Sequence, residues 1–155
     1  MAAIRTRRRL AGFTVTEMLV VVAIMGILSA IATPFMGEMI RRQRIKTAAF
    51  DVFASLAFAR SEAIRRNTSV TITPTGGNWA SGWQILDSNN NMLRQQSGWD
   101  TLTAVGPASV VFASSGRATA LARISLSSTG VDASSYRCVK LDLSGRAVST
   151  EGACS

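Results

Sequence analysis

A single carboxylate, Glu17, stands at the start of a long apolar run. The run extends from Met18 to Met36 and is interrupted only by Gly26, Ser29, Thr33 and Pro34. An ionisable group is costly in a membrane segment, so its presence indicates a function, with a positive charge as its natural partner. Other chemistry is sparse, because the chain has no histidine and only two cysteines, Cys138 and Cys154. Without histidine there is no Ser-His-Asp or Cys-His constellation, and a zinc site lacks its usual ligands. We therefore expect no catalytic residue, no metal site and no cofactor.

A basic leader precedes the apolar run and sets its orientation. Residues 1–12 carry no acid and four arginines, at Arg5, Arg7, Arg8 and Arg9. The apolar run is long enough to cross a bilayer core, which takes ~20 residues, and the arginines hold the N-terminus in the cytoplasm. A secretory signal would be cut after its apolar region. Here the candidate cleavage site, between Gly12 and Phe13, lies before the run, so the apolar segment is expected to stay in the mature chain. A plain single-pass anchor explains this pattern except for Gly12, Phe13 and Glu17.

Gly12, Phe13 and Glu17, placed after a basic leader, resemble the class III signal of type IV pilins and pseudopilins. The resemblance implies that a prepilin peptidase cuts between Gly12 and Phe13 and methylates the new amine of Phe13. It also implies an assembly role for Glu17. The ammonium of Phe13 and the Glu17 carboxylate of a neighbouring subunit can neutralise each other in lipid, where either charge alone is expensive.

The helix is expected to continue beyond the apolar run to about Arg66. Apolar residues recur there at steps of three and four, which predicts an amphipathic helix packed on a sheet. They are Ile45, Ala49, Val52, Phe53, Leu56, Ala59, Ala63 and Ile64. A cluster of cations at Arg41, Arg42, Arg44 and Lys46 is expected to form a solvated collar that touches lipid headgroups or a neighbouring subunit.

Beyond Asn67 the composition is typical of strands and turns. Asn89-Asn90-Asn91 predicts the turn of a hairpin. The expected strands are 70–73, 83–87, 92–96, 101–105, 109–113, 120–127 and 136–143. We expect an α+β fold, in which a long N-terminal helix (a membrane half and an amphipathic half) packs on an antiparallel β-sheet. The expected organisation is a cleaved basic leader at 1–12, a transmembrane or filament-core segment at 13–36, an amphipathic segment at 37–66 and a β-rich domain at 67–155.

The body of the chain resembles the FimT/GspH family of minor pilins and pseudopilins. The pieces that carry the resemblance are Ala59–Ala63, Val70–Ile72, Gly82-Trp83, Phe112–Arg117 and the terminal Cys138…Gly145-Arg146…Cys154 arrangement. The resemblance implies the pilin fold and a protein of the bacterial inner membrane, with a cytoplasmic N-terminus and a periplasmic domain. Such a subunit joins major and minor pilins in a pilus or in its priming or tip complex. From Arg41 onward thirteen basic and seven acidic residues give a net charge of +6. This charge favours the FimT side, and so a type IV pilus; the alternative is a GspH-like minor pseudopilin of a type II secretion system.

Export would place Cys138 and Cys154 in an oxidising compartment, where they should form a disulfide. The C-terminal region also offers a candidate nucleic-acid site. Some FimT-like minor pilins bind DNA for natural transformation through a C-terminal Gly-Arg-x-Arg element. The matching positions here are Gly145 and Arg146, but Val148 stands where the second arginine is expected.

Arginine suits phosphate because its planar fork makes charge-assisted bonds, so a rigid basic tip could hold a DNA duplex without recognising its sequence. The cations that could join Arg146 in such a tip are Arg137, Lys140, Arg117 and Arg123. Leu141 and Leu143 are expected to face the core, which leaves Lys140 and Asp142 on the other face of the strand. The alternative to a DNA site is a turn glycine at 145 and a solvated arginine at 146. The three tryptophans, Trp79, Trp83 and Trp99, either stack on bases or belong to the core.

Overall fold

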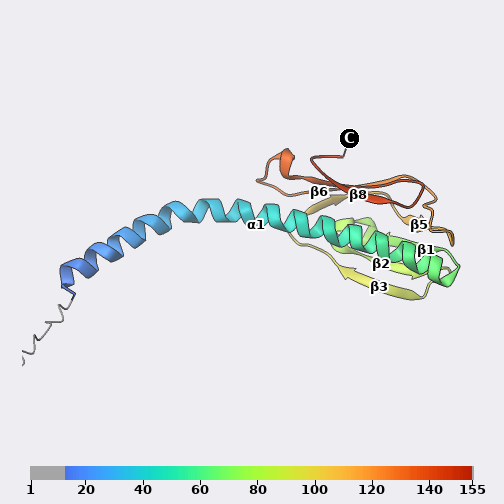
Figure 1. Cartoon of the computed structure of the whole chain (residues 1–155), viewed down its shortest axis with the longest axis horizontal. Coiled ribbons are helices and arrows are strands. Elements are labelled where there is room, and N and C mark those ends of the chain that lie inside the picture. Colours follow the sequence, from blue (N-terminus) through green and yellow to red (C-terminus); the bar gives the residue numbers. More distant parts are fainter. Residues whose placement is uncertain (1–12, 155) are drawn as a thin grey trace, which may run out of the picture. The chain divides into compact units, whose positions relative to one another are not determined.

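The computed structural model describes residues 13–154, with the backbone alone described for residues 31–35. It contains two compact units, the first ending at Gly37 and the second beginning at Glu38. One helix, α1 (Val15–Arg66), supplies residues to both units (Figure 1). The second unit contains all the strands and the hydrophobic core.

The second half of α1 forms because one face of it can be buried. Its core residues are Ile45, Ala48, Ala49, Val52, Leu56, Ala59 and Ala63, each at most 2% exposed. The predicted stripe is confirmed except at its margins, since Phe53 is half-buried and Ile64 is 52% exposed. The helix ends where Asn67 adopts a φ of 52°. The N–H groups of Asn67 and Thr68 then donate to the carbonyl oxygens of Ile64 and Ala63, which is a Schellman motif.

An acidic residue near this end, Glu62, is held by two arginines. Its carboxylate accepts hydrogen bonds from Arg65 (3.0 and 2.5 Å) and from Arg66 (2.7 Å). These bonds lower the pKa of Glu62 from 4.5 to about 2, and the bond from Arg65 has the largest effect. Because the folded-state pKa lies below the ordinary value, the stabilisation is present above about pH 4.5 and is lost as the pH falls toward 2.

We therefore expect Glu62→Gln to flatten the acid limb of the stability profile. Thermal unfolding of the full chain in detergent, followed between these two pH values, should show a steeper loss of melting temperature in the wild type than in the variant. Asp51→Asn is a control of opposite sign, because burial raises the pKa of the Asp51 carboxyl. At pH values above that pKa, removing the carboxyl should raise the melting temperature. At low pH, it should leave the melting temperature unchanged. Parallel wild-type and Glu62→Gln profiles would contradict the assignment.

The strands form two four-stranded antiparallel sheets rather than the single sheet expected from the sequence. The first sheet has the order β3-β2-β1-β5 and the second β4-β6-β7-β8. Their bounds are β1 (Val70–Pro74), β2 (Gly82–Asp87), β3 (Met92–Ser97), β4 (Thr103–Val105), β5 (Val110–Phe112), β6 (Ala122–Ser127), β7 (Arg137–Leu141) and β8 (Ala147–Glu151). Short 3-10 turns cover Thr75–Gly77, Trp79–Ser81 and Ala133–Ser135. The predicted hairpin turn lies between β2 and β3, with Asn90 at a φ of 61°.

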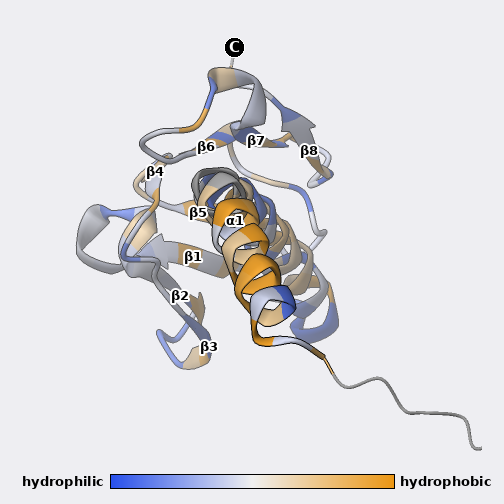
Figure 2. Cartoon of the chain, turned by 90° about the vertical axis from the view of Figure 1, so that its left-hand side faces the viewer, coloured by the Kyte–Doolittle hydropathy of each residue, from blue (hydrophilic) through white to orange (hydrophobic). Residues whose placement is uncertain are grey.

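The two sheets cover different sides of the second half of α1, as Figure 2 shows. Alternate residues of β1 and β6 point to this helix and are buried, among them Ile72 and Ile124. Trp79 and Trp83 are at most 2% exposed and Trp99 is half-buried against the same core. The indole N–H of Trp79 donates to the carbonyl oxygen of Pro107 at 2.8 Å. The tryptophans therefore belong to the core.

The C-terminal region departs most from the expectation. β7 ends at Leu141, which is buried, so the expected strand at 136–143 is too long. Leu143 lies in the following turn and is 45% exposed, so its placement in the core is wrong. An unexpected strand, β8, then pairs with β7 over Ala147–Glu151.

Candidate functional site

The start of α1 places Glu17 in a capping arrangement. α1 begins at Val15, and the hydroxyl oxygen of Thr14 accepts a hydrogen bond from the backbone N–H of Glu17 at 3.2 Å. Thr14 is thus the N-cap and Glu17 the third helical residue, the spacing of a capping box. Phe13, immediately before the cap, is 78% exposed. Gly12 lies outside the described residues, as does the whole leader.

The first unit presents apolar side chains to its surroundings. Those more than 60% exposed are Phe13, Val15, Leu19, Val22, Met25, Ile27 and Leu28. Glu17 is exposed among them. Within the part of the chain that the structure describes, no helix meets the length and hydropathy needed to cross a bilayer.

The cations predicted to form a solvated collar are exposed, and three of them also contact loops of the second unit. Arg41 donates to the carbonyl oxygen of Thr129 at 3.4 Å, and Arg44 to the hydroxyl of Thr101 at 3.1 Å. Arg42 pairs with Glu38 and lies 3.6 Å from a carboxylate oxygen of Asp132. Three of the four predicted collar residues therefore make contacts within the domain.

The C-terminal turn is built around Gly145 and is fixed to α1. The N–H of Gly145 donates to the carbonyl oxygen of Asp142 at 3.0 Å, and its own carbonyl accepts from the Arg60 guanidinium at 2.9 Å. Gly145 has a φ of +79°, and a Cβ there would collide with the carbonyl oxygen of Gly116. Three motif pieces that are distant in the sequence, around residues 60, 116 and 145, therefore meet at one point.

Asp142 organises this turn. Its carboxylate accepts from the Ser144 hydroxyl at 2.5 Å and from the Arg146 N–H at 3.0 Å. These two bonds lower the pKa of the Asp142 carboxyl below its usual value, and the bond from Ser144 has the larger effect. The turn is therefore held by an ionised carboxylate at neutral pH, and it presents Arg146 to solvent.

The register of the second sheet determines which of the predicted basic residues share a face. Lys140 lies opposite Arg123 on β6 and opposite Val148 on β8, so these three form one row on the outer face. Arg146 lies in the turn just before β8, where it is exposed at one end of this row and borders a hollow beside Arg60. Lys140 thus sits beside the position where the second arginine of the Gly-Arg-x-Arg element is missing.

Two other predicted residues lie elsewhere. Arg137 is three residues before Lys140 on the same strand, so it lies on the inner face, where it pairs with Glu151 at 2.6 Å. Arg117 is exposed and follows Gly116, next to the turn at Gly145. Arg137 is therefore not part of the outer row.

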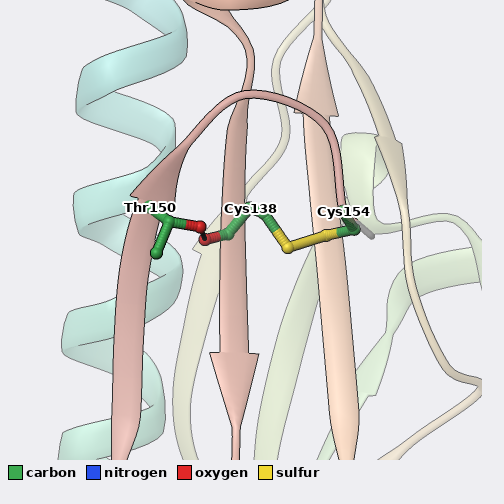
Figure 3. The surroundings of a disulfide bond; sticks show 3 residues. All are labelled: Cys138, Thr150 and Cys154. Carbon is green, nitrogen blue, oxygen red and sulfur yellow. Dashed lines mark hydrogen bonds between the residues drawn. A yellow bond between two sulfur atoms is a disulfide. The ribbon is translucent and has the colours of Figure 1, made fainter.

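Cys138 and Cys154 form the expected disulfide, with Cα atoms 5.1 Å apart. Figure 3 shows the chain after β8 turning back over β7 to bring Cys154 to Cys138. Cys138 is fully buried, and the hydroxyl of Thr150 donates to its carbonyl oxygen at 3.4 Å. The bridge thereby ties the end of the chain across the β7–β8 hairpin. In residues 13–154 no group of three potential metal ligands comes together.

Comparison with known families decides what kind of domain this is. The family described as type II transport protein GspH matches residues 48–145, more than half of the chain. The chain belongs to the GspH family. A second model, the prokaryotic N-terminal methylation motif, matches residues 7–33 and so includes Gly12, Phe13 and Glu17. No curated protein matches the chain.

Solved structures share the fold of this GspH-family chain. The type IV minor pilin FimU of Pseudomonas aeruginosa superposes with a TM-score of 0.61 at 23% identity, covering 69% of this chain and 88% of that one. The minor pseudopilin EpsH from the type II secretion system of Vibrio cholerae gives a TM-score of 0.58 at 13% identity, covering 74% and 98%. The expected pilin fold and the resemblance to minor pilins and pseudopilins are confirmed.

Proposed function

We propose that this chain is a minor type IV pilin. A prepilin peptidase removes residues 1–12 and methylates Phe13, and the mature subunit then joins other pilins from the bacterial inner membrane. The observation that carries the proposal is the methylation motif at residues 7–33 followed in one chain by a GspH domain at 48–145. The capped helix start supports it, because Phe13 lies exposed just before the N-cap and Glu17 lies exposed in the first turn of α1.

The membrane orientation is part of this proposal. The apolar run from Met18 to Met36 anchors the subunit, the leader arginines stay in the cytoplasm, and the second unit lies in the periplasm until assembly. The pilus is favoured over the type II secretion pseudopilus because the second unit is basic, with a net charge of +6 from Arg41 onward.

The proposal is tested by expressing the full chain with a prepilin peptidase in a piliated host. We expect mass spectrometry to find a mature chain that begins at Phe13 and carries one extra methyl group. Glu17→Gln should still be processed but should be absent from sheared surface filaments. Glu38→Gln, which removes an exposed carboxylate paired with Arg42, is the matched control and should assemble normally. A processed chain that never enters surface filaments but restores protein secretion would identify a pseudopilin instead.

A second function, sequence-independent capture of duplex DNA, is proposed from the outer row of the second sheet. Arg123 and Lys140 face outward side by side, and Arg146 is exposed in the turn just before the next strand, β8. Such a row can contact successive phosphates without reading bases.

DNA titration at two salt concentrations tests this function. We expect Lys140→Ala or Arg146→Ala to weaken binding and to reduce the dependence of log K on log salt by about 0.9 for each phosphate that the variant no longer neutralises. Arg94→Ala removes an equal charge from the opposite sheet and should leave the slope unchanged. Equal effects of all three substitutions would show that net charge, and not the row, attracts the DNA.

A further inference from the structure

A groove follows β8 along its free edge, between this strand and α1. Three adjoining hollows of about 660, 330 and 380 Å³ lie in sequence from Gly145 to Glu151. Phe53 lines the first and second hollows, and Lys46 and Arg137 line the second and third. The hollows therefore form one elongated groove about as long as the strand beside it.

The backbone of β8 points hydrogen-bonding groups toward this groove. Two bonds fix the alternation: the Asp142 N–H donates to the Arg146 carbonyl at 3.1 Å, and the Gly152 N–H donates to the Tyr136 carbonyl at 2.8 Å. In an antiparallel ladder every second residue bonds to the partner strand and the residues between point away from it. The outward-pointing residues are Ala147, Ser149 and Glu151. β7 is the only strand that pairs with β8 in the described part of the chain.

β8 differs from the other sheet edges in lacking protection. β4 and β5 are three residues long. β3 is longer, but its pairing contains a register shift and it carries Arg94 over the Phe58 ring. These are the usual devices that prevent an edge from pairing with another chain. β8 has five residues, with no proline, lysine or bulge.

The floor of the groove is apolar although it is open to solvent. Phe50 is 67% exposed, Ile64 is 52% exposed, and Phe53 and Ala57 lie between them along α1. Helical spacing puts these residues on the side of α1 next to β8. An added strand would cover them and remove their surface from water.

The charge of the groove selects among possible occupants. Lys46 lines the end near Glu151, and Arg60 and Arg146 line the end near Gly145. Glu151 is the only carboxylate that lines the three hollows within the described residues, and it is paired with Arg137. The groove therefore carries an excess of positive charge at both ends of an apolar floor.

We propose that the β8 groove binds an extended segment of a partner protein by strand addition. The segment carries apolar side chains at alternate positions, which pack on Phe50 and Phe53, and a carboxylate near each end, which meets Lys46 and Arg60. Main-chain bonds to Ser149 and its neighbours supply binding that is independent of side chains, and the pockets supply the specificity. The proposal concerns the folded second unit and holds whether or not the chain enters a pilus.

The probe is the peptide Glu-Thr-Val-Thr-Val-Thr-Glu, whose glutamates and valines all face one side of a strand. The full-length chain in detergent is titrated with this peptide, labelled for fluorescence anisotropy. We expect saturable binding that is lost when the backbone amides of the peptide are methylated at alternate positions. Methylation makes the peptide more apolar, so retained or stronger binding would indicate partition into detergent and would overturn the proposal.

Two protein variants locate the site. Ser149→Pro removes an outward N–H and no bond to β7, and we expect binding to weaken about tenfold or more. Phe50→Ser should also weaken it, whereas Val105→Ser, which removes an equally exposed side chain from β4, should not. The Phe50 variant keeps the test decisive if the proline destabilises the strand. Equal binding by Phe50→Ser and the wild type would overturn the proposal.

Sedimentation of the chain without peptide gives the remaining outcome. The chain could self-associate without binding the peptide, and Ser149→Pro could abolish that self-association. This result would assign the β8 edge to a second copy of this chain and would overturn the proposal of an acidic partner segment. A monomer that binds the unmethylated peptide supports the proposal as stated.

Discussion

Gly145→Ala is expected to lower the free energy of unfolding by about 3 kcal/mol or more. Part of this loss arises because alanine at a φ of +79° is strained, at ~1–2 kcal/mol. The rest arises because the new methyl group would collide with the carbonyl oxygen of Gly116, a backbone atom that cannot rotate away. Moving the turn aside would also break the bond from Arg60 to the Gly145 carbonyl. Chemical denaturation of the full chain in detergent measures the change.

Gly152→Ala separates the two causes. Gly152 has a φ of +90°, but nothing lies within 4 Å of a Cβ built there. Its substitution should therefore cause only the conformational loss, ~1–2 kcal/mol. If both variants lose the same stability, close packing of the turn on Gly116 contributes nothing, and the convergence of the three motif pieces has no energetic importance.

The helix and most strands could be predicted because their signals are local. The apolar spacing from Ile45 to Ala63 corresponds to the buried face of α1. β8 was missed because its sequence, from Ala147 to Glu151, has no apolar alternation. A strand usually shows that alternation because one of its faces is covered, and the inner face of β8 borders an open groove. The missing sequence signal and the open edge have the same cause.

The placement of the cations proposed to bind DNA could be predicted only in part. The odd separation of Arg137 and Lys140 on one strand already implies opposite faces, so the sequence could have excluded Arg137. The neighbours of Lys140 depend on the pairing of β6, β7 and β8, which no local pattern specifies. The contacts of the collar arginines could not be predicted for the same reason, since their partners Thr101 and Thr129 come from distant loops.

Reduction of the Cys138–Cys154 bridge is expected to cause a loss of stability comparable to that of Gly145→Ala. The cysteines are 16 positions apart, and closing a loop of that size stabilises a folded chain by about 3 kcal/mol on the chain-entropy model. We expect reduction to lower the melting temperature by roughly 10 °C. The loss should be accompanied by faster hydrogen exchange in β8, because among the described strands this one pairs only with β7 and is followed by the disulfide-bound tail.

The double variant Cys138→Ala with Cys154→Ala is the control for the reducing agent. It should melt at the temperature of the reduced wild type or below, because alanine at the fully buried position 138 also leaves a small void. Reducing agent should not change it further. A wild-type melting temperature that is insensitive to reduction would mean that the β7–β8 ladder alone holds the C-terminal hairpin. In that case β8 would be rigid enough to accept an added strand without the bridge, and peptide binding should survive reduction. If the bridge stabilises β8 as expected, reduction should weaken both the fold and the groove.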